Sequence, residues 1–167
     1  ALMICCESLN IPCVAFRYQN VYGPGQSLTN PYTGILSIFS TRIKQQKSIN
    51  IFEDGKESRD FVFIDDVVQA TVLGIEKPEA NYQVFNVGTG IATNVITVAE
   101  SLIKNYGIQI PLEISGQYRK GDIRHNFADI TLIKEKLGFV PTVDFETGLK
   151  LFCNWVNQQS PAEDKYE

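Results

Sequence analysis

The sequence lacks the features that mark several specialised classes of protein. Its 167 residues include one histidine and four cysteines, and no two cysteines form the C-x-x-C pair of a zinc or thioredoxin-like site. No apolar run approaches the ~20 residues that span a bilayer. The net charge of -4 argues against a general nucleic-acid-binding surface, which is basic. We therefore expect no metal site, no membrane partner and no nucleic-acid partner.

The rest of the composition is that of an ordinary globular protein. Hydrophobic residues make up 44% of the chain and charged residues 20%, which are usual proportions. Cys5, Cys6 and Cys153 recur among apolar residues at helical spacing. We expect them to be buried, reduced thiols of a cytoplasmic protein.

Strand-like and helix-like segments alternate along the chain, which favours an α/β fold. The predicted strands cover residues 13–18, 49–52, 59–64, 83–87 and 111–114. The predicted helices cover residues 1–9, 34–46, 97–106 and 131–137, with one helix after Asp65-Asp66 and a last one after Asp144. Residues 1–9 resemble the end of a helix with no N-cap before it, so we expect the chain to be a piece of a longer protein.

Several residues are predicted to begin or end these helices. Asp65 or Asp66 can cap the helix that follows, whose apolar face is predicted to carry Val67, Val68, Thr71, Val72 and Ile75. The run from Thr97 to Glu100 fits a capping box. Gly138 is a typical helix terminator, and Asp144 is a typical N-cap.

The segment from Phe16 to Gln26 is the first candidate site. An apolar strand runs into polar residues and then into Gly23-Pro24-Gly25. Ligands of open α/β sheets bind at the carboxyl ends of strands, where Arg17 to Asn20 would stand. The alternative, an ordinary strand followed by a Gly-Pro turn, remains open on this evidence.

Two further segments carry arginines that suit an anionic ligand. Arg59 begins a predicted strand, and a guanidinium is a rigid fork of donors for phosphate; the alternative is an ion pair with Asp60 or at the surface. Residues 119–125 form a basic loop around one glycine and one acid, and the alternative there is a solvated loop. Arg17, Arg59 and Arg119 together are typical of an anion held from several sides. His125 is interpreted as a structural hydrogen-bonding residue.

The pattern Gly88-Thr89-Gly90 follows a predicted strand and is a near miss to a dinucleotide-binding fingerprint. The third glycine is replaced by Thr93, and the next helix is predicted to start several residues later. We therefore interpret the pattern as a turn.

Four ordered motifs resemble the nucleotide-sugar epimerases and dehydratases, which are extended short-chain dehydrogenases/reductases. They are Arg17 to Pro24, Arg59 to Val67, Phe85 to Gly90 and Arg119 to His125. The loop at residues 30–34 resembles a 4-epimerase subgroup that acts on deoxyhexose nucleotides. The resemblance implies that Tyr18 and Gln19 lie beside the nicotinamide end of NAD. It implies that Asn20 binds the substrate diphosphate, that Thr33 lines the sugar-phosphate loop and that Phe52 packs on the nucleobase. It also implies that Arg59 and Arg119 bind the phosphates and that Asp122 binds a ribose hydroxyl.

The family's glycine-rich cofactor loop and its catalytic Tyr-x-x-x-Lys have no counterpart in this sequence. Residues 1–9 resemble the remainder of the helix that carries that motif. The resemblance therefore implies the C-terminal part of a Rossmann-like fold, with the last parallel strands and a small mixed substrate-binding subdomain. Residues 1–167 would be the nucleotide-sugar-binding portion, without the N-terminal cofactor half and without catalytic residues.

The resemblance implies an intact NAD-dependent epimerase, a homodimer, acting at C4 of a nucleoside-diphosphate hexose. A nucleotide-sugar 4,6-dehydratase and a non-catalytic nucleotide-sugar-binding module are the alternatives. We expect residues 1–167 alone to be inactive. Strands that lack neighbours expose their edges, so self-association, or apolar patches where the cofactor half docks, is also expected.

Overall fold

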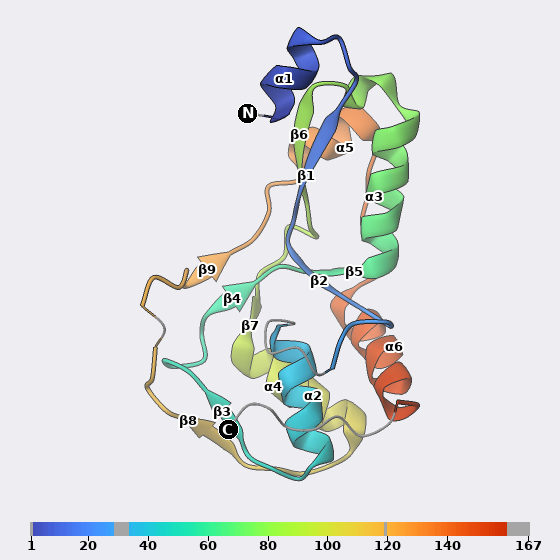
Figure 1. The fold of residues 1–167 in the computed structure, drawn as a ribbon. Helices are drawn as coiled ribbons and strands as arrows, with labels where there is room; N and C mark the ends of the chain where they lie inside the picture. Colours follow the sequence, from blue (N-terminus) through green and yellow to red (C-terminus); the bar gives the residue numbers. More distant parts are fainter. Residues whose placement is uncertain (1, 29–33, 119, 160–167) are drawn as a thin grey trace.

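The computed structural model describes residues 2–28, 34–118 and 120–159 (Figure 1). The helices are α1 (Leu2–Ser8), α2 (Ile35–Lys44), α3 (Ile64–Glu76), α4 (Val95–Tyr106), α5 (Thr131–Leu137) and α6 (Phe145–Asn157), with a 3-10 turn η1 (Pro78–Ala80). The strands are β1 (Val14–Tyr18), β2 (Asn20–Tyr22), β3 (Ile49–Ile51), β4 (Ser58–Arg59), β5 (Phe61–Phe63), β6 (Gln83–Val87), β7 (Thr93–Asn94), β8 (Leu112–Ile114) and β9 (His125–Asn126).

The fold is built around one extended segment that changes partners at Gln19. Strand β1 pairs with β6 in parallel, and β2 pairs with β5 in parallel. The N–H of Gln19 donates to the backbone carbonyl of Val87 at 2.9 Å. The N–H of Asn20 donates to the backbone carbonyl of Asp60, also at 2.9 Å. The backbone is thus hydrogen-bonded on both sides of the change. These parallel strands with intervening helices confirm the α/β prediction.

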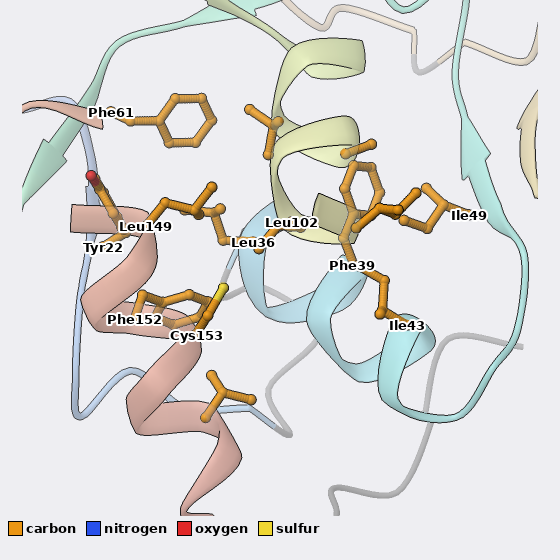
Figure 2. Packing of buried hydrophobic residues seen from close by; sticks show 14 of the residues in the cluster. Tyr22, Leu36, Phe39, Ile43, Ile49, Phe61, Leu102, Leu149, Phe152 and Cys153 are labelled. Carbon is orange, nitrogen blue, oxygen red and sulfur yellow. The ribbon is translucent and has the colours of Figure 1, made fainter. Parts of the chain in front are cut away.

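The point at which this segment changes partners, between β1 and β2, is called the fork below. Two apolar clusters lie on either side of it. One packs β1 and β6 between α3 and α5, around Phe85 and Phe139. The larger cluster lies among α2, α4 and α6 (Figure 1). Figure 2 shows Phe152 and Leu149 of α6 beside Leu36 of α2. Burying one such side chain stabilises the fold by about 1.5–3 kcal/mol.

Two small sheets join the fork to the helical part of the molecule. Strands β3 and β8 pair in parallel, and β4 lies between β7, which is antiparallel to it, and β9, which is parallel. The sequence did not predict β7 and β9. Each has two residues, which is too short for an alternating pattern to show.

The predicted strand at residues 59–64 is wrong in its extent, because Asp60 interrupts it and Ile64 already belongs to α3. The predicted capping of α3 is also wrong. The helix begins after Phe63 with no side-chain cap. Buried Asp66 instead accepts from the N–H and hydroxyl of Thr142, both at 2.8 Å. It therefore ties α3 to the segment before α6.

Helix α4 begins two residues before the predicted capping box. Its N-cap is Asn94, which makes no side-chain cap bond. The N–H groups of Val95 and Ile96 donate to the carbonyls of Glu57 and Gly55, at 3.0 and 3.1 Å. Backbone from a distant turn thus replaces the side-chain cap. The predictions for α5 and α6 are confirmed, because Gly138 ends α5 in a left-handed conformation and Asp144 caps α6.

The predicted apolar face of α3 is only partly buried. Val67 lies in the core, whereas Val68 and Ile75 are 53% and 77% exposed. Gly74 lies on the packed side instead, against the ring of Phe16. Apolar side chains exposed on α3 agree with the expected apolar patches, and the expected self-association remains a prediction.

The thiol predictions divide in the same way. Cys153 is buried, and burial raises its pKa to about 11. Cys5 is exposed and Cys6 is half-buried, so their predicted burial is wrong, because α1 contains no buried residue. Within the described part of the chain, no helix has both the length and the apolar character needed to cross a membrane.

Candidate functional site

One cavity brings together residues from four separate segments. Its volume is about 400 Å³, and its lining includes Asn20, Phe52, Arg59 and Asp122. Asn20 begins β2, Phe52 follows β3, Arg59 ends β4, and Asp122 lies in the loop before β9. The structure therefore gathers these predicted substrate-binding residues around one space. The other two, Thr33 and Arg119, lie outside the described residues.

Arg59 is the cation in the wall of this cavity. Its Nη2 donates to Asp122 Oδ1 at 3.0 Å, and its Nη1 donates to the carbonyls of Ser58 and Arg124 at 2.9 and 3.1 Å. The side chain is 17% exposed. Because a guanidinium has five N–H donors, it can keep these partners and still donate to an anion. Of the alternatives for Arg59, the ion pair with Asp60 is wrong, whereas an ion pair at the surface is observed, with the half-exposed carboxylate of Asp122.

Asp60 has a different task, which the sequence did not reveal. Its buried carboxylate accepts from the N–H of Thr89 at 2.8 Å, from the Thr89 hydroxyl at 2.6 Å, from Gly90 N–H at 2.9 Å and from Ala128 N–H at 3.1 Å. A Cβ at Gly88 would collide with the same carboxylate and with Gln19. The interpretation of Gly88 to Gly90 as a turn is confirmed. Its amides bind Asp60 and are not directed at a phosphate.

Phe52 lies between two hollows. Besides the main cavity it lines a second, shallower one of about 590 Å³, together with residues 115–118. The N–H of Glu53 donates to the carbonyl of Gln117 at 2.7 Å, which holds the two segments side by side. An aromatic ring in this position can stack on a planar ligand group.

An acidic cluster borders the cavity beside Phe52. Carboxylate oxygens of Glu53, Asp54 and Glu57 lie within 4.8 Å of one another. The guanidinium of Arg124 donates to Glu53 at 2.7 Å and to both oxygens of Asp54 at 2.9 and 2.8 Å. Hydrogen bonding from Arg124 lowers the pKa of Asp54, whereas burial raises the pKa of Glu57. The cluster is thus held together by one cation.

The two residues expected near the nicotinamide lie apart from the main cavity. Gln19 lines an adjoining cavity of about 370 Å³, which it shares with Asn20. Its buried Oε1 has no hydrogen-bond partner among the described residues. Tyr18 is 45% exposed, and its hydroxyl lies 3.0 Å from Thr71 Oγ1. Their role beside NAD stays a prediction.

Two other residues named by the sequence have clear positions. His125 Nδ1 lies 2.9 Å from Ser58 Oγ, which agrees with its interpretation as a structural hydrogen-bonding residue. Arg17 is exposed and is not part of the cavity lining. The prediction that Arg17, Arg59 and Arg119 hold one anion together is therefore wrong for Arg17. Of the three, only Arg59 lines the cavity among the described residues.

Comparison with known proteins identifies the family of the chain. Residues 2–88 match the model of the NAD dependent epimerase/dehydratase family, which is more than half of the chain. The chain belongs to this family.

Individual relatives are nucleotide-sugar 4-epimerases. A curated dTDP-L-rhamnose 4-epimerase from Burkholderia thailandensis is 39% identical over 148 residues, covering 89% of this chain and 40% of the relative. A UDP-glucose 4-epimerase from Thermotoga maritima, solved with UDP-glucose, superposes with a TM-score of 0.87 at 36% identity, covering 94% of this chain and 50% of that one. A UDP-N-acetylglucosamine 4-epimerase from Methanobrevibacter ruminantium, solved with UDP-N-acetylmuramic acid, has a TM-score of 0.86 at 32% identity, covering 95% and 50%.

The chain thus spans about half the length of the solved relatives and less of the curated one. The family is NAD-dependent, but the described residues do not form a complete NAD site. Their one glycine pattern after a strand is the turn whose amides bind Asp60.

Proposed function

We propose that residues 1–167 are the nucleotide-sugar-binding portion of an NAD-dependent epimerase that acts at C4 of a nucleoside-diphosphate hexose. The observation that carries the proposal is the cavity lined by Asn20, Phe52, Arg59 and Asp122. These four residues offer an amide, an aromatic ring, a guanidinium and a carboxylate to one ligand, and the carboxylates of Glu53 and Glu57 also line the cavity. A nucleoside diphosphate has a matching base, ribose and charged phosphates.

Each residue in the cavity has a distinct part in this proposal. Phe52 would stack on the base, Asp122 would accept from a ribose hydroxyl, and Arg59 and Asn20 would donate to the phosphates. The Asp122 carboxylate already holds the Arg59 guanidinium in place at 3.0 Å, so the donors are oriented before a ligand binds. Thr33 and Arg119 would complete the contacts, as the family resemblance implies.

The proposed substrate class is a deoxyhexose nucleotide. The curated relative at 39% identity is a dTDP-L-rhamnose 4-epimerase, and rhamnose is a 6-deoxyhexose. The alternative functions are a nucleotide-sugar 4,6-dehydratase and a non-catalytic nucleotide-sugar-binding module. We further propose that the intact protein has an N-terminal half that binds NAD, that it is a homodimer, and that it is cytoplasmic.

The substitution Arg59→Ala tests the proposal. Isothermal titration of the chain with dTDP and UDP should show binding that the variant weakens by about 10- to 150-fold, because losing a charge-assisted contact costs about 1.5–3 kcal/mol. Lys150→Ala on the exposed side of α6 is the control and should bind like the parent. Equal affinities of the parent and Arg59→Ala would contradict the assignment. NAD-dependent turnover by the purified chain would contradict the absence of catalytic residues.

A further inference from the structure

Arg124 joins two segments that carry the residues of the cavity. Its side chain donates to Glu53 Oε2 at 2.7 Å and, through two bonds, to the Asp54 carboxylate at 2.9 and 2.8 Å. Its carbonyl accepts from Ser58 N–H at 3.0 Å and from Arg59 Nη1 at 3.1 Å. One residue thus binds the turn after Phe52 with its side chain and strand β4 with its backbone.

These bonds influence where two of the charged groups of the cavity, Asp122 and Arg59, are placed. Asp122 lies two residues before Arg124, and its Oδ1 faces Arg59 Nη2 at 3.0 Å. The turn that Arg124 holds begins directly after Phe52. Movement of Arg124 would therefore move Asp122 and Arg59 relative to the aromatic ring.

The charges around Arg124 make its guanidinium hard to replace. Three carboxylate oxygens, one each from Glu53, Asp54 and Glu57, lie within 4.8 Å of one another. The Glu57 oxygen Oε1 is 3.9 Å from Arg124 Nη1. Without the guanidinium these groups would repel one another, and the turn would open. A lysine keeps the charge but lacks the planar fork, whose Nη1 donates to Glu53 while its Nη2 donates to both oxygens of Asp54.

We propose that Arg124 is a positioning residue, which holds Asp122 and Arg59 in register with Phe52 for an anionic nucleotide ligand. This inference rests on the proposed function of the cavity. Arg124 does not itself line the cavity, so its effect on binding would pass through the residues it holds.

The first test needs no ligand. Hydrogen exchange of the 167-residue chain should show that Arg124→Ala raises the exchange rate of the Ser58 amide by about tenfold or more. The Gln19 amide, which donates to Val87, is the internal reference and should not change. Unchanged Ser58 exchange would overturn the inference. If Arg124→Ala does not fold, Arg124→Lys and Asp54→Asn carry the same test.

The second test measures affinity for dTDP and UDP by titration calorimetry. Arg124→Ala should weaken binding at least about tenfold, the size of one lost charge-assisted contact, and Arg124→Lys should restore part of it. In an Asp54→Ala background the Arg124→Ala effect should shrink, because the two residues act through one bond pair. Lys150→Ala is the control.

The two tests separate the possible failures. Faster Ser58 exchange with unchanged affinity would refute the positioning role while leaving the proposed function intact. A parent chain that binds neither dTDP nor UDP would refute the proposed function, and the positioning role for a nucleotide would fall with it. Faster exchange together with weaker binding is the expected result.

Discussion

Replacing Asp60 by alanine is expected to destabilise the fold strongly. The carboxylate is fully buried and accepts from three backbone N–H groups and one hydroxyl. Those donors come from the turn after β6 and from Ala128, so Asp60 joins three parts of the chain. A carboxylate has two acceptor oxygens with about four acceptor sites, which neither an amide nor a hydroxyl can match.

The size of the effect follows from the donors left behind. The N–H of Ala128 lies in a buried contact, and those of Thr89 and Gly90 lie in partly buried ones. A buried donor left without a partner costs about 1–3 kcal/mol, and water can reach the partly buried pair. We therefore expect Asp60→Ala to lower the free energy of unfolding by about 3–5 kcal/mol, out of a usual total of about 5–15 kcal/mol.

Urea unfolding measures this loss. Trp155 is the single tryptophan and packs against Phe152 with ring centroids 6.0 Å apart, so its fluorescence reports the core of the helical part. Asp60→Asn keeps one acceptor oxygen but turns an NH2 group toward N–H donors from which it cannot accept, so we expect it to recover only part of the stability lost in Asp60→Ala. Asp65→Asn is the matched control, since Asp65 is exposed in the first turn of α3. A loss below about 1 kcal/mol for Asp60→Ala, at an unchanged dependence on urea, would refute the reasoning.

Two further predictions concern α6. Gly148→Ala should lower the free energy of unfolding by about 1–3 kcal/mol, because a Cβ would collide with the Tyr22 hydroxyl and Phe63; overpacking of this kind outweighs the helix propensity of alanine, worth about 1 kcal/mol. A more stable variant in urea would contradict it. Hydrogen bonds from Thr147 lower the pKa of the Asp144 carboxyl group, which caps α6. The stabilisation that this carboxylate gives the folded chain is therefore complete above the ordinary carboxyl pKa. It is lost as the pH falls through the lower pKa of the folded state. Melting temperatures of the parent and Asp144→Asn from about pH 6 to about pH 2 should therefore converge on the acid side, and a constant difference would contradict the role of the charge.

Local sequence patterns were sufficient where the physics is local. Gly138 and Asp144 act within one turn of their own helices, so they could be recognised from the sequence. The β1 and β6 strands could be predicted from their short runs of strand-forming residues, although β1 contains no fully buried residue. The family resemblance named Asn20, Phe52, Arg59 and Asp122, and their common cavity agrees with one shared ligand.

Local patterns in the sequence predicted the alternation of strands and helices and the helix ends at Gly138 and Asp144, because these features depend on neighbours in the chain. The pairs of distant groups that meet could be recognised only from the folded chain. Asp60 bonds to Thr89 and Ala128, Asp66 bonds to Thr142, and Arg124 bonds to Asp54. A buried carboxylate must find donors wherever the fold brings them, and no local pattern states which ones. The same reason explains why backbone carbonyls rather than a side chain cap α4.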